Sequence, residues 1–68
     1  MIRLKINGVD EEVAAANLVE LLSARGIDPQ VRFLAIALNG AVVRRLEWRS
    51  TPLSAGDEVE IVRPIQGG

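Results

Sequence analysis

The sequence is short and contains neither cysteine nor histidine. Its 68 residues are 49% hydrophobic and 25% charged, with a net charge of −1, which is typical of one globular domain and not of a disordered chain or a nucleic-acid binder. The two missing residue types exclude disulfides and thiolate chemistry, and they remove the commonest general base and metal ligand. We expect a cytoplasmic protein, because no apolar run approaches the ~20 residues of a membrane span and residues 1–8 lack a signal-peptide core.

Residues 2–13 have the pattern of a β-hairpin. Apolar residues alternate with polar ones between positions 2 and 6, which is the period of a strand with one buried face. Asn7-Gly8 follows, and this pair favours a two-residue turn in which both central residues have positive φ. Residues 9–13 then predict the returning strand.

The next segment changes to helical spacing. Three leucines recur at this spacing between positions 18 and 22. Asn17 is a good N-cap, Glu20 stands where a capping box needs an acidic residue, and Gly26 favours a stop. The pattern predicts a helix over residues 17–25, short enough to depend on tertiary packing.

The second half of the chain predicts a second hairpin and a last strand. Residues 31–38 form a nearly continuous apolar run, and the Asn39-Gly40 that follows favours a strand entering a turn over a buried helix. Residues 44–57 contain proline and glycine and predict a loop. Residues 58–62 alternate again, and Pro64 predicts the end of this strand because proline cannot donate to a β-ladder.

The order of these elements predicts an α+β domain with the β-grasp, or ubiquitin-like, fold. Two hairpins flank one helix, and the remaining strand fits between them, next to the first strand and parallel to it. We expect a mixed sheet of about five strands with one main helix packed on one face. The domain should span residues 1–64, and residues 65–68 should form a flexible C-terminal tail, because two glycines are costly to order.

The last residues, Ile65-Gln66-Gly67-Gly68, suit chemistry at a carboxylate. Two residues without a Cβ make a thread that fits a channel too narrow for side chains. A carboxylate becomes an acyl donor once ATP adenylates it, so a partner would supply the catalysis and this chain the recognition. By itself the terminal Gly-Gly is weak evidence for such chemistry. Terminal glycines are usually disordered ends, and Gly-Gly arises at a chain end by chance in roughly one chain in two hundred.

Charged residues are unevenly placed along the chain. Asp10, Glu11 and Glu12 are consecutive, but such runs are usually solvated turns or strand edges, so we predict no metal site. Five arginines lie in the second half of the chain: Arg32, Arg44, Arg45, Arg49 and Arg63. They fit either solvated positions at strand edges or a patch that binds an acidic partner.

Two stretches carry a resemblance to a known family. LAIALNGAVVRRLEW and LSAGDEVEIVRPIQGG are similar to the pattern of ThiS, the sulfur carrier family of thiamine biosynthesis. That pattern has an apolar strand, Asn-Gly, two valines, an arginine and a tryptophan, then Gly-Asp-Glu and a strand that ends in Gln-Gly-Gly. The resemblance covers essentially the whole chain, and its specific part is the second half.

The resemblance implies a carrier and not an enzyme. An ATP-dependent activating enzyme of the ThiF or MoeB type would adenylate Gly68, and sulfur from a persulfide donor would replace the adenylate to give a thiocarboxylate. A thiazole synthase of the ThiG type would then take the sulfur. Gly68 is the implied modified residue, and Ile65, Gln66 and Gly67 form the implied recognition tail. The chain would bind no cofactor itself, carry no catalytic side chain, and need neither nucleic acid nor membrane.

Three other functions stay open on the sequence. The small subunit of molybdopterin synthase has the same fold and the same terminal chemistry. A ubiquitin-like protein modifier is a different class, which detection of an isopeptide adduct on a target would favour. A plain binding module with an irrelevant tail would work equally well without Gly68.

Overall fold

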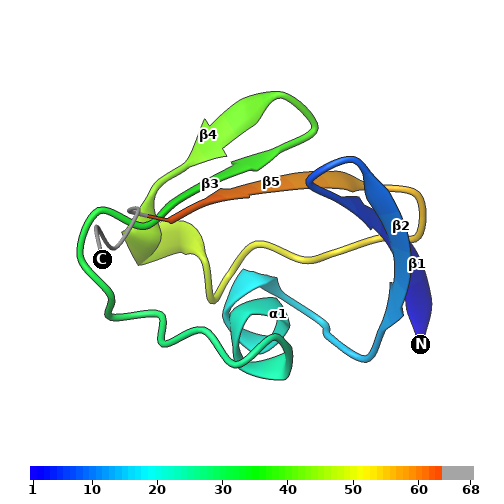
Figure 1. The fold of residues 1–68 in the computed structure, drawn as a ribbon, viewed down its shortest axis with the longest axis horizontal. Helices are drawn as coiled ribbons and strands as arrows, with labels where there is room; N and C mark the ends of the chain where they lie inside the picture. The colour runs from blue at the N-terminus through cyan, green and yellow to red at the C-terminus, as the bar shows by residue number, and fades with distance from the viewer. Residues whose placement is uncertain (64–68) are drawn as a thin grey trace, which may run out of the picture.

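The structure is a computed structural model that describes residues 1–63. The expected domain boundary after residue 64 and the expected tail, residues 65–68, lie outside the described residues. The elements follow one another as β1 (Ile2–Ile6), β2 (Val9–Val13), α1 (Leu18–Ala24), β3 (Ala35–Leu38), β4 (Ala41–Val43), the 3-10 helix η1 (Arg45–Glu47) and β5 (Glu58–Val62) (Figure 1).

The five strands form one mixed sheet in the order β2-β1-β5-β3-β4. The last strand of the chain is therefore the middle strand of the sheet. It pairs parallel with β1 and antiparallel with β3, and each hairpin is antiparallel. The helix α1 lies on one side of this sheet (Figure 1). The β-grasp fold, with the first and last strands adjacent and parallel, is confirmed.

The helix begins and ends where the capping residues predict, to within one residue. The Asn17 side chain accepts a 2.9 Å hydrogen bond from the Glu20 backbone N–H, so it is the N-cap, and the helix runs from Leu18 to Ala24. At the other end of the helix Gly26 has φ +73, and the backbone N–H of Ile27 donates a 2.8 Å hydrogen bond to the Leu22 carbonyl. This is a Schellman motif, in which glycine supplies the left-handed residue. No helix among residues 1–63 is long and apolar enough to cross a membrane.

The core is almost entirely aliphatic, with one aromatic side chain. The three predicted leucines of α1 are fully buried, and burial of each contributes about 1.5–3 kcal/mol. Trp48 is 2% exposed, and its indole N–H donates to the Val43 carbonyl at 2.8 Å, so the polar end of this side chain has a partner inside the core. The buried residues are Leu4, Ile6, Val13, Leu18, Leu21, Leu22, Ile27, Leu34, Ile36, Trp48, Val59 and Ile61.

The prediction of a strand over residues 31–38 is wrong in its first half, because β3 begins only at Ala35. Ala35 already pairs with Val62, the last residue of β5, so no strand among residues 1–63 continues this pairing further back. Phe33 has φ +62, which no strand residue adopts. The predicted loop over residues 44–57 also differs, since it contains the short helix η1.

Two asparagine side chains hold β5 from opposite sides. Asn7, at φ +50, lies just beyond β1; its amide accepts from the Ile61 N–H at 2.8 Å and donates to the Ile61 carbonyl at 3.3 Å. Asn39, at φ +51, accepts from the Glu58 N–H at 2.9 Å. Asparagine tolerates positive φ, so the same residue can form the turn and reach the neighbouring strand.

The bridge from Asn7 to β5 can be tested by its removal. Asn7→Gly keeps a residue that adopts positive φ but removes two hydrogen bonds, each worth about 0.5–1.5 kcal/mol, so the free energy of unfolding should fall by about 1–3 kcal/mol in urea denaturation. Ala55→Gly, in an exposed loop, measures the cost of an added glycine alone. A loss no larger than that of Ala55→Gly would contradict the role of the bridge.

Candidate functional site

The residues predicted to react and to be recognised, Ile65, Gln66, Gly67 and Gly68, lie outside the described residues. Their point of attachment is described, because β5 ends at Val62 and Arg63 follows it. Since β5 is held on both sides, the chain leaves the sheet from a fixed position.

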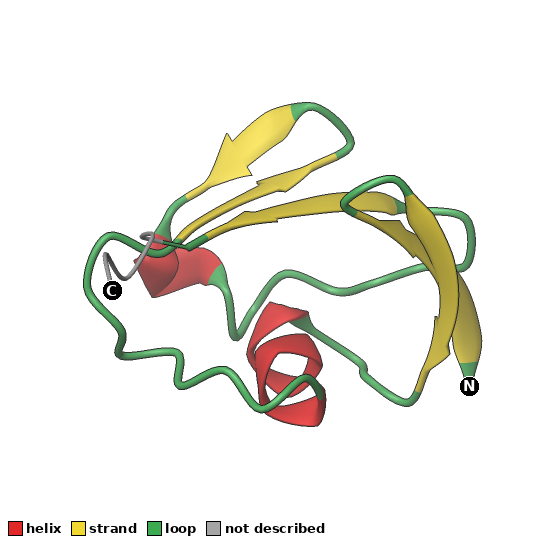
Figure 2. Cartoon of the chain, in the orientation of Figure 1, coloured by secondary structure: helices red, strands yellow, loops and turns green. Residues whose placement is uncertain are grey.

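Three segments meet where β5 ends. Val62 pairs with Ala35 at the start of β3, and Ile36 pairs with Val43 at the end of β4. The loop before β3 and the helix η1 after β4 therefore lie at this end of the sheet, as Figure 2 shows. We call residues 31–34, 43–49 and 61–63 the arginine-rich end.

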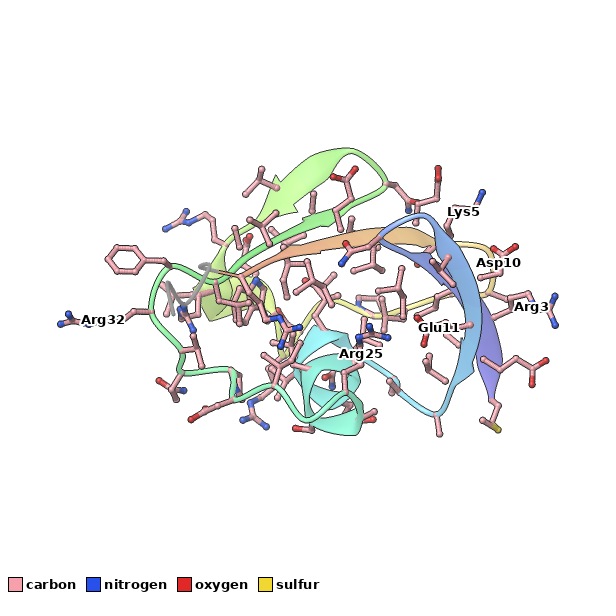
Figure 3. The ribbon with its side chains drawn as sticks, viewed as in Figure 1. Arg3, Lys5, Asp10, Glu11, Arg25 and Arg32 are labelled. Atoms are coloured by element: carbon pink, nitrogen blue, oxygen red, sulfur yellow. The ribbon has the colours of Figure 1, made fainter. Side chains whose placement is uncertain are left out.

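The arginine-rich end carries most of the positive charge of the chain. It holds five of the eight basic residues and one of the nine acidic residues, so its net charge is +4, whereas the rest of the chain carries −5. The salt bridges of the described residues, Arg3–Glu12 and Arg25–Glu11, both lie elsewhere. Figure 3 shows Arg32 pointing away from the molecule at one end, while Arg3, Lys5 and Asp10 lie at the opposite end.

One of these arginines has a structural role. Arg45 donates hydrogen bonds to the backbone carbonyls of Pro29 and Val31, the latter at 2.8 Å, and its guanidinium lies 4.7 Å from the centre of the Trp48 ring. Trp48 is itself fixed in the core, so Arg45 ties the loop before β3 to a rigid support. Arg32, Arg44, Arg49 and Arg63 are exposed.

Large apolar side chains are exposed beside these cations. Phe33 is 81% exposed, Leu46 is 86% exposed and Val62 is 58% exposed. A hollow of about 370 Å³ also opens there, lined in part by Pro29, Arg45 and Leu46. The arginine-rich end thus combines cations, exposed apolar groups and the start of the predicted tail.

The acidic cluster near the first turn has a different character. Glu11 forms two 2.9 Å hydrogen bonds with Arg25 at the end of α1, and Glu12 lies 3.3 Å from Arg3 on the neighbouring strand. These pairs join β2 to the helix and to β1. No group of three or more potential metal ligands occurs among residues 1–63.

Two features of the site were not found from the sequence. The pair Arg44-Arg45 gives no sign of which guanidinium binds the backbone carbonyls of the loop before β3. Phe33 stands in an apolar run that is typical of a buried strand, and only its φ and its exposure separate it from that pattern.

Comparison with known proteins gives a consistent result. The model of the ThiS family matches residues 4–68 of the chain. A crystal structure of the thiamine biosynthesis protein ThiS from Geobacter metallireducens is 34% identical with a TM-score of 0.79, and the match covers 98% of this chain and 100% of that one. A solution NMR structure of a thiamine biosynthesis protein from the same organism is 34% identical with a TM-score of 0.80, over 98% and 88% of the two chains. No curated protein sequence gives a significant match.

The role of Arg45 can be tested by a conservative change. Lysine keeps the charge but lacks the planar fork that reaches two carbonyls while stacking on an indole, so Arg45→Lys should lower the free energy of unfolding by about 1–2 kcal/mol. It should also speed hydrogen exchange at the Val31 amide, which is bonded within this loop. Arg49→Lys, at an exposed position, is the matched control. Equal effects of the two variants would show that Arg45 does not hold the loop.

Proposed function

Because the chain belongs to the ThiS family, we propose that it is a sulfur carrier of thiamine biosynthesis with its reacting carboxylate at Gly68. The observation that carries this proposal is the extent of the family match, which continues through Gly67 and Gly68. The two similar structures are named as thiamine biosynthesis proteins, which favours this pathway over that of the molybdenum cofactor.

The geometry of β5 supports a carrier that presents its end to other proteins. The strand is fixed by backbone pairing with β1 and β3 and by two asparagine side chains. Gly68 follows Arg63 by five residues, which span at most about 17 Å when fully extended. A partner can therefore bind the folded domain on its surface while the carboxylate reaches a fixed distance into the partner's active site.

The proposed chemistry takes place in the partners. A carboxylate oxygen of Gly68 attacks the α-phosphorus of ATP, and pyrophosphate leaves. The terminal sulfur of a persulfide then attacks the acyl carbon and displaces AMP, which gives an acyl disulfide. A thiol attacks the donor's sulfur in this S–S bond, so a disulfide forms on the donor and the thiocarboxylate is released. Thiazole synthase takes up this sulfur. The chain contributes position and recognition and no catalytic side chain, and the cytoplasm, where ATP is available, is the compartment that this proposal implies.

The position of the carboxylate can be tested by moving it. One alanine added after Gly68 retains a carboxylate but displaces it, and deletion of Gly68 displaces it in the other direction. Attack requires the reacting atoms to be about 3–3.5 Å apart, and an error of about 1 Å can cost ~100-fold in rate. Both variants should unfold at the wild-type temperature and should lower ATP–pyrophosphate exchange by the activating enzyme at least ~100-fold.

Glu12→Ala is the control, because Glu12 is exposed and lies on an edge strand away from the end of β5. It should leave the exchange rate within about twofold of wild type, since an exposed ion pair contributes little to stability. If the extended or shortened chain is adenylated at the wild-type rate, Gly68 is not the reacting residue and the proposal is wrong.

Formation of the thiocarboxylate should change the mass of the protein. Protein purified from its own cells during thiamine limitation should contain a species heavier by the difference between one sulfur and one oxygen atom, and fragmentation should locate this difference at Gly68. Chains that end at Gly67 should lack it. A modification on Lys5, or an isopeptide adduct to another protein, would favour the protein-modifier class instead.

A further inference from the structure

We propose that the arginine-rich end is a docking surface for the enzyme that adenylates Gly68. That enzyme should present an acidic surface with an apolar recess for Phe33 around the entrance through which the tail passes. This inference rests on the proposed function, because it takes Gly68 to be the reacting residue.

The length of the chain that follows β5 limits where a partner can bind. If Gly68 reacts inside the partner, the partner must come within about 17 Å of Arg63, because five residues reach no further. The surface around Arg63 is the arginine-rich end, since Val62 pairs with Ala35 and the loop before β3 lies beside it. Whatever binds the tail must therefore face these side chains.

The charge of the arginine-rich end favours an acidic partner surface. The arginine-rich end has a net charge of +4 in a chain whose total is −1, and none of its arginines forms a salt bridge within residues 1–63. A partner surface of opposite sign would bind this end in preference to the rest of the molecule, which carries a net charge of −5. Charge complementarity thus selects an acidic partner surface and also orients the carrier with its tail toward the partner.

Phe33 combines a strained backbone conformation with an exposed side chain. Positive φ is unfavourable for a bulky residue, and such strain is usually compensated by buried contacts. Phe33 has φ +62 but is 81% exposed, so packing within the described domain does not compensate for it. Arg45 holds the preceding backbone through the Pro29 and Val31 carbonyls, which fixes the loop that displays the ring. A rigid, exposed aromatic side chain beside cations is the composition of an interface hot spot.

The phosphates of ATP are a less suitable partner for these arginines. They must meet the carboxylate at the tip of the tail, whereas Arg63 directly precedes the tail and Arg32 lies in the loop that leads to Ala35, the partner of Val62. When the tail enters a channel of the partner, its first residue and its terminal carboxylate are separated by most of the length of the tail. The arginines then remain at the channel entrance, where the charge opposite them belongs to protein carboxylates.

The test measures pyrophosphate exchange by the activating enzyme of the same organism as a function of carrier concentration. Arg32→Glu and Phe33→Asn should each raise KM for the carrier about tenfold or more and leave kcat within about twofold, because they weaken docking and not the reaction. Lys5→Glu changes the net charge by the same amount as Arg32→Glu but lies at the opposite end, and it should leave KM within about twofold. Added salt should raise KM for the wild type far more than for Arg32→Glu.

Phe33→Asn separates docking from folding. Asparagine tolerates positive φ, so this variant should unfold at the wild-type temperature or above it. Unchanged KM in Arg32→Glu and Phe33→Asn, or an equal rise in Lys5→Glu, would overturn the docking surface and leave the carrier function intact. A wild-type chain that supports no exchange at all would overturn the proposed function, and this inference with it.

Discussion

The sheet depends on the backbone pairing of β5 with a hairpin on each side. The hairpins β1–β2 and β3–β4 do not pair with each other, so β5 alone joins them into one sheet. Its parallel contact with β1 is short, with Lys5 opposite Glu58 and Ile6 opposite Val59, and the side chain of Asn7 continues it to Ile61. The core between the sheet and α1 is complete only once this strand is in place, because Val59 and Ile61 belong to the core.

Local patterns predicted most of the fold, because most of its elements are specified by near neighbours in the sequence. Asn-Gly located both hairpins, Asn17 and Gly26 bounded the helix, and the alternation in β1 and β5 identified their buried faces. The same patterns could not show that Asn7 bridges to Ile61, since that contact joins residues far apart in the chain. For the same reason the sequence predicts strand at residues 31–34: their apolar composition is right, but no strand among residues 1–63 pairs with them.

The candidate site was only partly predictable. The sequence located the expected reacting residues and the excess of arginines, but it did not show that Arg45, unlike Arg32, binds two backbone carbonyls and supports a loop. That distinction depends on Trp48 and on two backbone carbonyls brought together by folding. The arginine-rich end carries +4 and the rest of the chain −5, so the electric field of a charged partner would orient the molecule during approach as well as attract it.

The place of β5 in the sheet also sets the order of events when the chain is synthesised. A ribosome makes the two hairpins and the helix first, and the strand that joins them emerges after all the others. Pairing of β1 with β5 must then close a loop that runs through almost the entire domain, which favours slow and late completion of the fold. A chain whose translation stopped before residue 58 would lack the middle of its sheet and would be open to proteolysis. The fold can therefore be complete only after synthesis has reached β5, which lies a few residues before Gly68, the residue proposed to carry sulfur.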